Sequence, residues 1–86
     1  MKQPNISIYG SKNCVDTTRA MRFLDDRAIL YEFKDVDLAP ELASYIAHLN
    51  GGTQKMPVIQ IDNEMLVNPS NEELGMAVEL AAAERP

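Results

Sequence analysis

The alternation of strand-like and helix-like segments over only 86 residues is the feature that most constrains how this chain can fold. Runs that alternate apolar and polar side chains are typical of half-buried strands, whereas apolar residues three and four apart are typical of amphipathic helices. The two patterns follow in the order strand, helix, strand, helix, two strands and helix. A chain of this length buries about one core. We therefore predict a single α/β domain over residues 1–86.

The predicted strands are short and are bounded by residues that favour turns. They cover residues 6–9, 29–36, 57–61 and 65–67. A helix between the first two strands implies parallel pairing through a right-handed crossover, whereas the close spacing of the last two predicts an antiparallel hairpin. The sequence therefore predicts a four-stranded mixed sheet with helices on both faces.

Three helices are predicted between and after these strands. The first follows the turn 10–13 with Asn13 as its N-cap, so that Cys14 lies in its first turn. The second ends at a pair of glycines, which suit a left-handed C-terminal cap. The third begins at Ser70, because a serine followed three residues later by Glu73 forms a capping-box sequence.

Charge and composition narrow the classes of partner. The net charge is -5 and the eight Lys and Arg residues are scattered, which argues against nucleic acid as a partner. No apolar run approaches the roughly 20 residues that span a bilayer, and the N-terminus is polar, so we expect neither a membrane segment nor a signal peptide. A lone cysteine is typical of a reducing compartment. We expect a cytoplasmic monomer that acts on small molecules and proteins.

Cys14 is the only thiol in the chain and the first candidate for chemistry. At a helix start, free backbone N–H groups and the helix dipole favour an anion and so lower the pKa of a thiol. Lys12 would add positive charge there, whereas Asp16 would oppose it. Cysteine is also among the most buried residue types, so a purely structural role is the alternative. We expect no metal, because His48 is the only histidine and one chain cannot complete a metal site.

Three segments resemble glutaredoxins, and the mycoredoxin branch most of all. They are Tyr-Gly-Ser-Lys-Asn-Cys at 9–14, the turn that leads to Met-Pro at 50–57, and Asn-Pro-Ser at 68–70. The resemblance covers nearly the whole chain, and the motifs occur in the family's order and at its separations. It implies a thioredoxin-like fold in which Cys14 is the attacking thiol.

The same resemblance assigns roles to residues that their own chemistry leaves open. It implies a cis peptide bond before Pro57, with Met56 offering its backbone to the substrate. Ser70 and Asn71 match the helix start that holds the carboxylate of a small thiol such as glutathione. An exposed helix N-terminus suits that role, because its free N–H groups bind carboxylates.

The sequence also departs from the family pattern. Most dithiol members have Cys-x-x-Cys, whereas residues 14–17 here are Cys-Val-Asp-Thr, with Thr17 in place of the resolving cysteine. Monothiol relatives that hold iron–sulfur clusters carry Cys-Gly-Phe-Ser, which is not present either. Asn13 stands where an aromatic residue is frequent, and the family lysine usually lies one residue earlier than Lys12. Because the chain has only one cysteine, an intramolecular disulfide is impossible.

Three functions fit these residues. The first is a monothiol oxidoreductase, in which the Cys14 thiolate resolves mixed disulfides between proteins and a small thiol. Thr17, one helical turn on, would donate its hydroxyl to the thiolate, and Lys12 would help to hold the charge. The second is a dimer that shares a [2Fe–2S] cluster through Cys14 and small thiols. The third is a protein-binding module that has lost catalysis.

Overall fold

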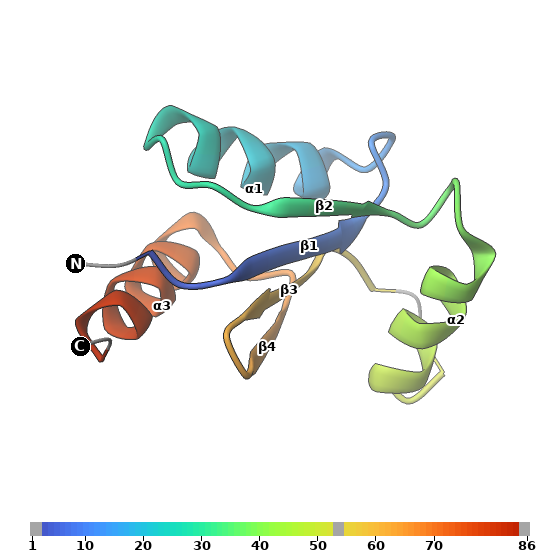
Figure 1. Cartoon of the computed structure of the whole chain (residues 1–86). Coiled ribbons are helices and arrows are strands. Elements are labelled where there is room, and N and C mark those ends of the chain that lie inside the picture. Colours follow the sequence, from blue (N-terminus) through green and yellow to red (C-terminus); the bar gives the residue numbers. More distant parts are fainter. Residues whose placement is uncertain (1–2, 53–54, 85–86) are drawn as a thin grey trace.

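The predicted order of strands and helices is confirmed. The computed structural model describes residues 3–52 and 55–84. Within them the elements are β1 (Ile6–Gly10), α1 (Val15–Asp26), β2 (Glu32–Asp35), α2 (Pro40–Leu49), β3 (Val58–Ile61), β4 (Glu64–Val67) and α3 (Asn71–Ala83) (Figure 1). This is the thioredoxin-like arrangement that the family resemblance implies. In the part of the chain that the structure describes, no helix is long and apolar enough to cross a membrane.

The four strands form one mixed sheet in the order β2-β1-β3-β4. β1 pairs with β2 in parallel, as expected for strands joined by a crossover helix, and β3 is antiparallel to both β1 and β4. The register places Tyr9 near the end of β1 beside Val58 at the start of β3, which in turn faces Val67 at the end of β4. The segments that follow β1, precede β3 and follow β4 therefore meet at one end of the sheet.

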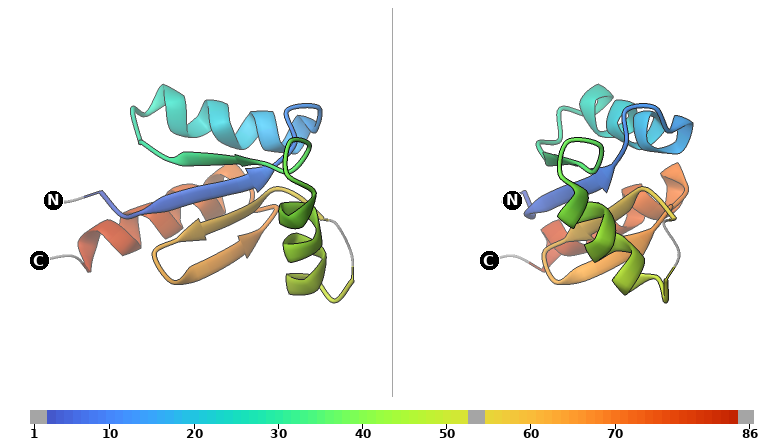
Figure 2. Two further views of the ribbon diagram at one scale, coloured as in Figure 1. Left: turned by 45° about the vertical axis from the view of Figure 1, so that its right-hand side comes forward. Right: turned by 90° about the vertical axis from the view of Figure 1, so that its right-hand side faces the viewer.

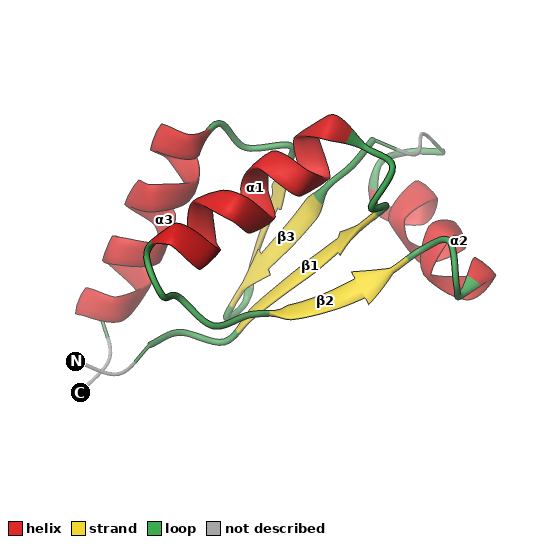
Figure 3. Cartoon of the chain, turned by 90° about the horizontal axis from the view of Figure 1, so that it is seen from above, coloured by secondary structure: helices red, strands yellow, loops and turns green. Residues whose placement is uncertain are grey.

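The larger core lies between the sheet and two helices. Ile8 and Ile59 are neighbours in the sheet and are fully buried against Leu24 of α1 and Leu74 of α3. Figure 3 shows α1 crossing over the strands with α3 beside it. Deep burial of apolar side chains of this size contributes about 1.5–3 kcal/mol each. This core holds α1 and α3 against the sheet.

A smaller core covers the opposite face of the sheet. Ile46 of α2 packs with Val36 and Val58, and partly buried side chains such as Tyr9 and Met56 surround them. α2 stands across the end of the sheet at which β1 stops, apart from α1 and α3 (Figure 2). Helices therefore lie on both faces, as predicted from the sequence.

The second strand begins three residues later than predicted. Residues 29–31 are not part of the sheet, although their side chains alternate like those of a strand. Ala28 has a φ of 55°, and the N–H of Ile29 bonds back to the carbonyl of Leu24 at the end of α1. The backbone of Leu30 is bonded to the side chain of Gln3, which donates to its carbonyl and accepts from its N–H. These bonds replace the strand pairing that the pattern predicted.

Candidate active site

Cys14 is the N-cap residue of α1. Its φ of -95° and ψ of 123° are extended, and its carbonyl accepts the N–H of Thr18 at 3.1 Å. The prediction of Asn13 as the N-cap is therefore wrong by one residue. Asn13 lies in the preceding turn, where its backbone N–H donates to Ser11 Oγ at 3.1 Å. The thiol thus lies at the N-terminus of α1, where the backbone N–H groups of the first turn have no partner within the helix.

The turn that carries Cys14 is fixed from the β2–α2 connection. Ser11 is buried, and its hydroxyl donates to Asp37 Oδ2. The N–H of Cys14 donates to the carbonyl of Ser11 at 3.0 Å, and the N–H of Val36 to the carbonyl of Gly10 at the same distance. Sequence reasoning missed this contact, because residues 11 and 37 are brought together only by the parallel pairing of β1 and β2.

The pKa of the Cys14 thiol is below its ordinary value. Burial is the largest influence and raises the pKa. The Thr17 hydroxyl, which approaches the sulfur without a completed hydrogen bond, and the N–H groups of Thr17 and Asp16 together outweigh it. The charge of the Asp16 carboxylate acts against them. Open N–H groups at a helix start stabilise a thiolate in this way. The site therefore favours the nucleophilic form of the thiol.

The hydroxyl of Thr17 is buried against the end of β1. The side chain is fully buried, and within residues 3–52 and 55–84 its Oγ1 has no completed hydrogen bond. A Cβ atom added to Gly10 would lie 2.5 Å from that oxygen, so the end of β1 packs directly on it. A buried hydroxyl without a partner costs about 1–3 kcal/mol. The thiolate of Cys14 is the acceptor that would recover this cost, since the hydroxyl already lowers the pKa of that thiol.

Lys12 points its ammonium group toward β2. Its Nζ lies 5.8 Å from the centroid of the Phe33 ring, a cation–π distance, and the side chain is exposed. Lys12 is not among the groups that shift the pKa of Cys14. Its predicted help to the thiolate stays a prediction.

The peptide bond between Met56 and Pro57 is cis, as the resemblance implies. Pro57 is buried, and its carbonyl accepts the N–H of Asn68 at 2.8 Å. Met56 is half-buried at the rim of the smaller core. This segment and the turn after β4 are thereby tied together at the same end of the sheet as Cys14.

Ser70 and Glu73 form the predicted capping box at the start of α3. Ser70 Oγ accepts the N–H of Glu73 at 3.1 Å, and Glu73 Oε1 accepts the N–H of Ser70 at 2.8 Å. The backbone N–H and the hydroxyl of Ser70 both act on the Glu73 carboxylate and hold the pKa of Glu73 below its usual value. Both polar groups of Ser70 that could face a ligand are therefore already engaged.

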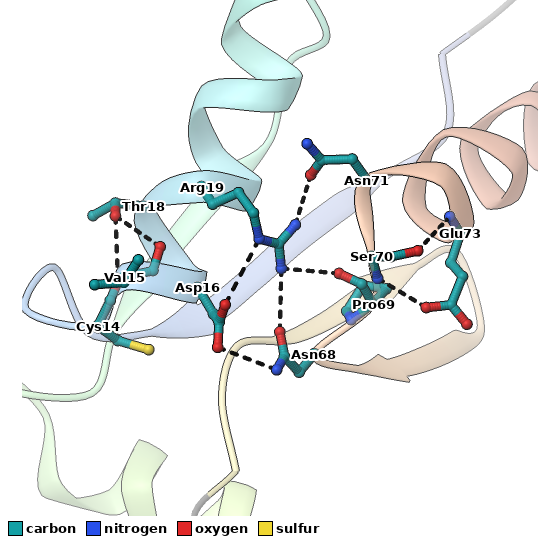
Figure 4. Close-up of polar contacts among 10 residues, drawn as sticks. All are labelled: Cys14, Val15, Asp16, Thr18, Arg19, Asn68, Pro69, Ser70, Asn71 and Glu73. Atoms are coloured by element: carbon teal, nitrogen blue, oxygen red, sulfur yellow. Dashed lines mark hydrogen bonds and ion pairs between the residues drawn. The ribbon is translucent and has the colours of Figure 1, made fainter.

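Arg19 joins α1 to the start of α3, a connection that the sequence analysis did not find. Figure 4 shows its guanidinium between the two elements. It donates to Asn71 Oδ1 at 2.6 Å, to Asn68 Oδ1 at 3.2 Å and to the carbonyl of Pro69 at 3.0 Å. Asp16 completes the group, with Oδ1 3.7 Å from Arg19 Nε and Oδ2 accepting from Asn68 Nδ2 at 3.2 Å. These side chains line a shallow depression together with Ser70, Glu72 and Glu73.

The sequence matches a known family over most of its length. The family model of glutaredoxin matches residues 6–66, which include Cys14 and the cis Pro57. The chain belongs to the glutaredoxin family. Glutaredoxins are thiol–disulfide oxidoreductases that generally draw on glutathione-type thiols and act on thiol-containing proteins. No curated protein matches the sequence.

Solved structures share the glutaredoxin fold of this chain at low sequence identity. A glutaredoxin from Brucella melitensis has a TM-score of 0.73 at 19% identity, over 95% of this chain and 89% of its own. A glutaredoxin from Archaeoglobus fulgidus has a TM-score of 0.69 at 19% identity, over 85% and 84%. The NrdH-redoxin of Escherichia coli, described as glutaredoxin-like with a thioredoxin-like activity profile, has a TM-score of 0.64 at 21% identity, over 95% and 96%.

The arrangement can therefore present a thiolate in the manner of a glutaredoxin. The structure places Cys14 and Thr17 in one helical turn, and Asp16 joins that turn to Asn68 and Asn71 through Arg19. It brings the cis-proline segment and the start of α3 to the same end of the sheet through the register of β1, β3 and β4. A second thiol is lacking from the whole chain.

Proposed function

We propose that this chain resolves mixed disulfides between proteins and a small thiol by a monothiol mechanism. The supporting observation is Cys14 at the start of α1, where its pKa is lowered although burial acts to raise it. The Cys14 thiolate attacks the small-thiol sulfur of the mixed disulfide. The S–S bond breaks, the protein thiolate leaves and takes up a proton, and Cys14 carries the small thiol.

An external thiol completes the reaction. With Thr17 in place of a second cysteine, the chain holds no internal thiol to attack the new disulfide. A second small-thiol molecule attacks the small-thiol sulfur, so that the Cys14 thiolate is released together with a small-thiol disulfide. Because this route consumes reduced thiol, a reducing compartment such as the cytoplasm suits it.

The small thiol would lie between the cis-proline segment and the start of α3. The backbone of Met56 would hold its peptide portion, and Asn71 with the first N–H groups of α3 would hold a carboxylate. Asn71 Oδ1 accepts from Arg19, so its amide N–H₂ group faces away from the arginine and can donate to a ligand. Ser70 would contribute through the capping box that shapes this turn, because its own hydroxyl and N–H are engaged by Glu73.

Mass spectrometry tests the proposal and identifies the thiol. The reduced protein is exposed separately to oxidised glutathione, mycothiol disulfide and bacillithiol disulfide. We expect an adduct on Cys14 with at least one of them, and turnover of a peptide mixed disulfide that rises with the concentration of the same reduced thiol. Cys14→Ser should form no adduct and transfer nothing, since no other thiol exists in the chain. Activity of Cys14→Ser above background, or no adduct with any of the three, contradicts the proposal.

A further inference from the structure

The guanidinium of Arg19 is held in one position by acceptors that do not belong to its own helix. Asn68 Oδ1, the carbonyl of Pro69 and Asn71 Oδ1 all accept from its terminal nitrogens, at 2.6–3.2 Å. A planar guanidinium matches such a set of acceptors, which a flexible ammonium cannot reach together. The third nitrogen, Nε, is left facing Asp16 at 3.7 Å (Figure 4).

Asp16 is a carboxylate in an unfavourable place for thiolate chemistry. It lies two residues after Cys14, and its charge raises the pKa of that thiol. Both of its oxygens are engaged by the group around Arg19, Oδ1 by the guanidinium and Oδ2 by the amide of Asn68. The Asp16 carboxylate is therefore held against Arg19 and Asn68, on the side that faces the start of α3.

Among the described residues, no charged side chain other than Arg19 forms an ion pair with Asp16. Besides Arg19, the charged side chains at this end of the sheet include Lys12, Asp16, Asp35, Asp37, Lys55, Glu72 and Glu73. Lys12 lies over Phe33, Asp37 accepts from Ser11, and Glu73 caps α3. Of the charged groups in residues 3–52 and 55–84, Asp16 is the one whose charge shifts the pKa of Cys14 directly, so Arg19 can act on the thiol only through Asp16.

We propose that Arg19 is a positioning residue for Asp16. By holding that carboxylate it limits the repulsion between Asp16 and the Cys14 thiolate, and its own position is set by residues 68–71 at the start of α3. The role of this inference in catalysis rests on the proposed function. The effect on the reactivity of Cys14 does not, because it can be measured on the thiol alone. Arg19 touches neither the sulfur nor the reacting disulfide. It pins a carboxylate that would otherwise move freely beside the nucleophile.

Alkylation of Cys14 by iodoacetamide as a function of pH tests the proposal in the full chain without any enzymatic assay. Five proteins are compared: the parent, Arg19→Met, Asp16→Asn, the double variant of both, and Arg22→Met. Arg22 is the matched control, because it is an exposed arginine on the same helix for which no ion pair is found in residues 3–52 and 55–84. Circular dichroism checks that each variant is folded.

We expect Arg19→Met to slow alkylation at pH 7 by roughly threefold, as for a thiol that has lost a partly exposed countercharge. In the Asp16→Asn background the same change should slow it by less than about 1.5-fold, because the carboxylate is gone. Arg22→Met should leave the rate unchanged. At a pH where the thiol is fully ionised in every variant, all rates should coincide, which separates ionisation from access to the sulfur.

Two results overturn the proposal. If Arg19→Met slows alkylation equally with and without Asp16, Arg19 acts directly on the sulfur and not through the carboxylate. If it does not slow alkylation at all, or slows it only as much as Arg22→Met does, the contacts of Arg19 serve the fold alone. Neither result bears on whether the chain transfers small thiols, which the adduct experiment decides by itself.

Discussion

Thr17 carries a conflict between stability and reactivity. Its hydroxyl is fully buried without a completed hydrogen bond in the described part of the chain, which destabilises the folded protein, yet it lowers the pKa of Cys14. Residues of this kind are typical of functional sites, where a local cost is offset by packing elsewhere. The balance can be tested, because valine has nearly the same shape as threonine but lacks the hydroxyl.

Thr17→Val should make the protein more stable and less reactive. Removing an unsatisfied buried hydroxyl should raise the free energy of unfolding by about 1 kcal/mol. Losing the same donor should raise the pKa of Cys14 and so slow alkylation at neutral pH. Chemical denaturation and alkylation rates measure the two effects separately.

The matched control for this change is Thr18→Val. The hydroxyl of Thr18 is exposed and bonds back to the carbonyls of Cys14 and Val15, so it offers nothing to the sulfur. We expect neither a gain in stability nor a change in alkylation rate. Equal loss of reactivity in the two variants would show that the hydroxyl of Thr17 has no special relation to the thiolate.

α1 is packed on β1 through a contact that only glycine permits. A Cβ on Gly10 would lie 2.5 Å from Thr17 Oγ1 and 2.7 Å from its Cγ2, which is closer than atoms can approach. Gly10→Ala should therefore destabilise the protein by about 1–3 kcal/mol, as for an overpacked core. Adding Thr17→Ala removes both clashing atoms, so the double variant should lose less than the sum of the single changes. Strict additivity in denaturant unfolding would contradict this packing.

The capping box makes the start of α3 sensitive to acid. The backbone N–H and the hydroxyl of Ser70 lower the pKa of Glu73 in the folded protein. A carboxyl whose pKa is lower when folded contributes stability above its unfolded value near 4.5, and that stability is lost as the pH falls through the folded value. The parent should therefore exceed Glu73→Gln in stability at pH 6, and the difference should shrink toward pH 3.

Glu72→Gln is the control for this effect. It removes a carboxylate from the same helical turn without touching either capping hydrogen bond. Its stability relative to the parent should change less with pH than that of Glu73→Gln. If the two variants follow the same pH curve in thermal unfolding, the general field of the helix start explains the sensitivity and the capping box does not.

The elements that could be predicted from sequence are those set by local patterns. The capping box at Ser70 depends on residues three apart, and the cis Pro57 followed from a family resemblance in the surrounding motif. The start of β2 was misplaced, because a side chain 27 positions away, Gln3, takes the backbone bonds of Leu30. Arg19 was missed for the same reason, since its partners lie 49–52 positions away. Local periodicity carries no information about such contacts.

The site is assembled by the sheet as a whole. Its three parts are the turn before α1, the cis-proline segment and the start of α3, which are far apart in sequence. They meet because β1 ends, β3 begins and β4 ends at the same end of the sheet. This follows from the antiparallel pairing of β3 with both of its neighbours. Because the chain has one thiol, the proposed mechanism takes a second thiol from solution in every turnover. Supplying that thiol from within the chain should therefore change the chemistry.

Thr17→Cys should convert the chain from a monothiol to a dithiol protein. The hydroxyl of Thr17 already lies near enough to Cys14 to lower its pKa, so a sulfur at the same position is in reach of the thiol. With oxidised glutathione, the new thiol should attack Cys14 in the adduct and expel glutathione. The oxidised monomer should then lack both free thiols and carry no adduct, as measured by mass spectrometry.

Thr18→Cys is the matched control for that result. It adds a thiol one residue further on, where the parent hydroxyl bonds to the carbonyls of Cys14 and Val15 and the side chain is exposed. This variant should keep the glutathione adduct on Cys14, because its second sulfur faces away from the first. If Thr17→Cys also keeps the adduct, the side chain of residue 17 does not face Cys14. The hydroxyl of Thr17 could then not reach the thiolate, and the assignment of Thr17 to the active site would be wrong.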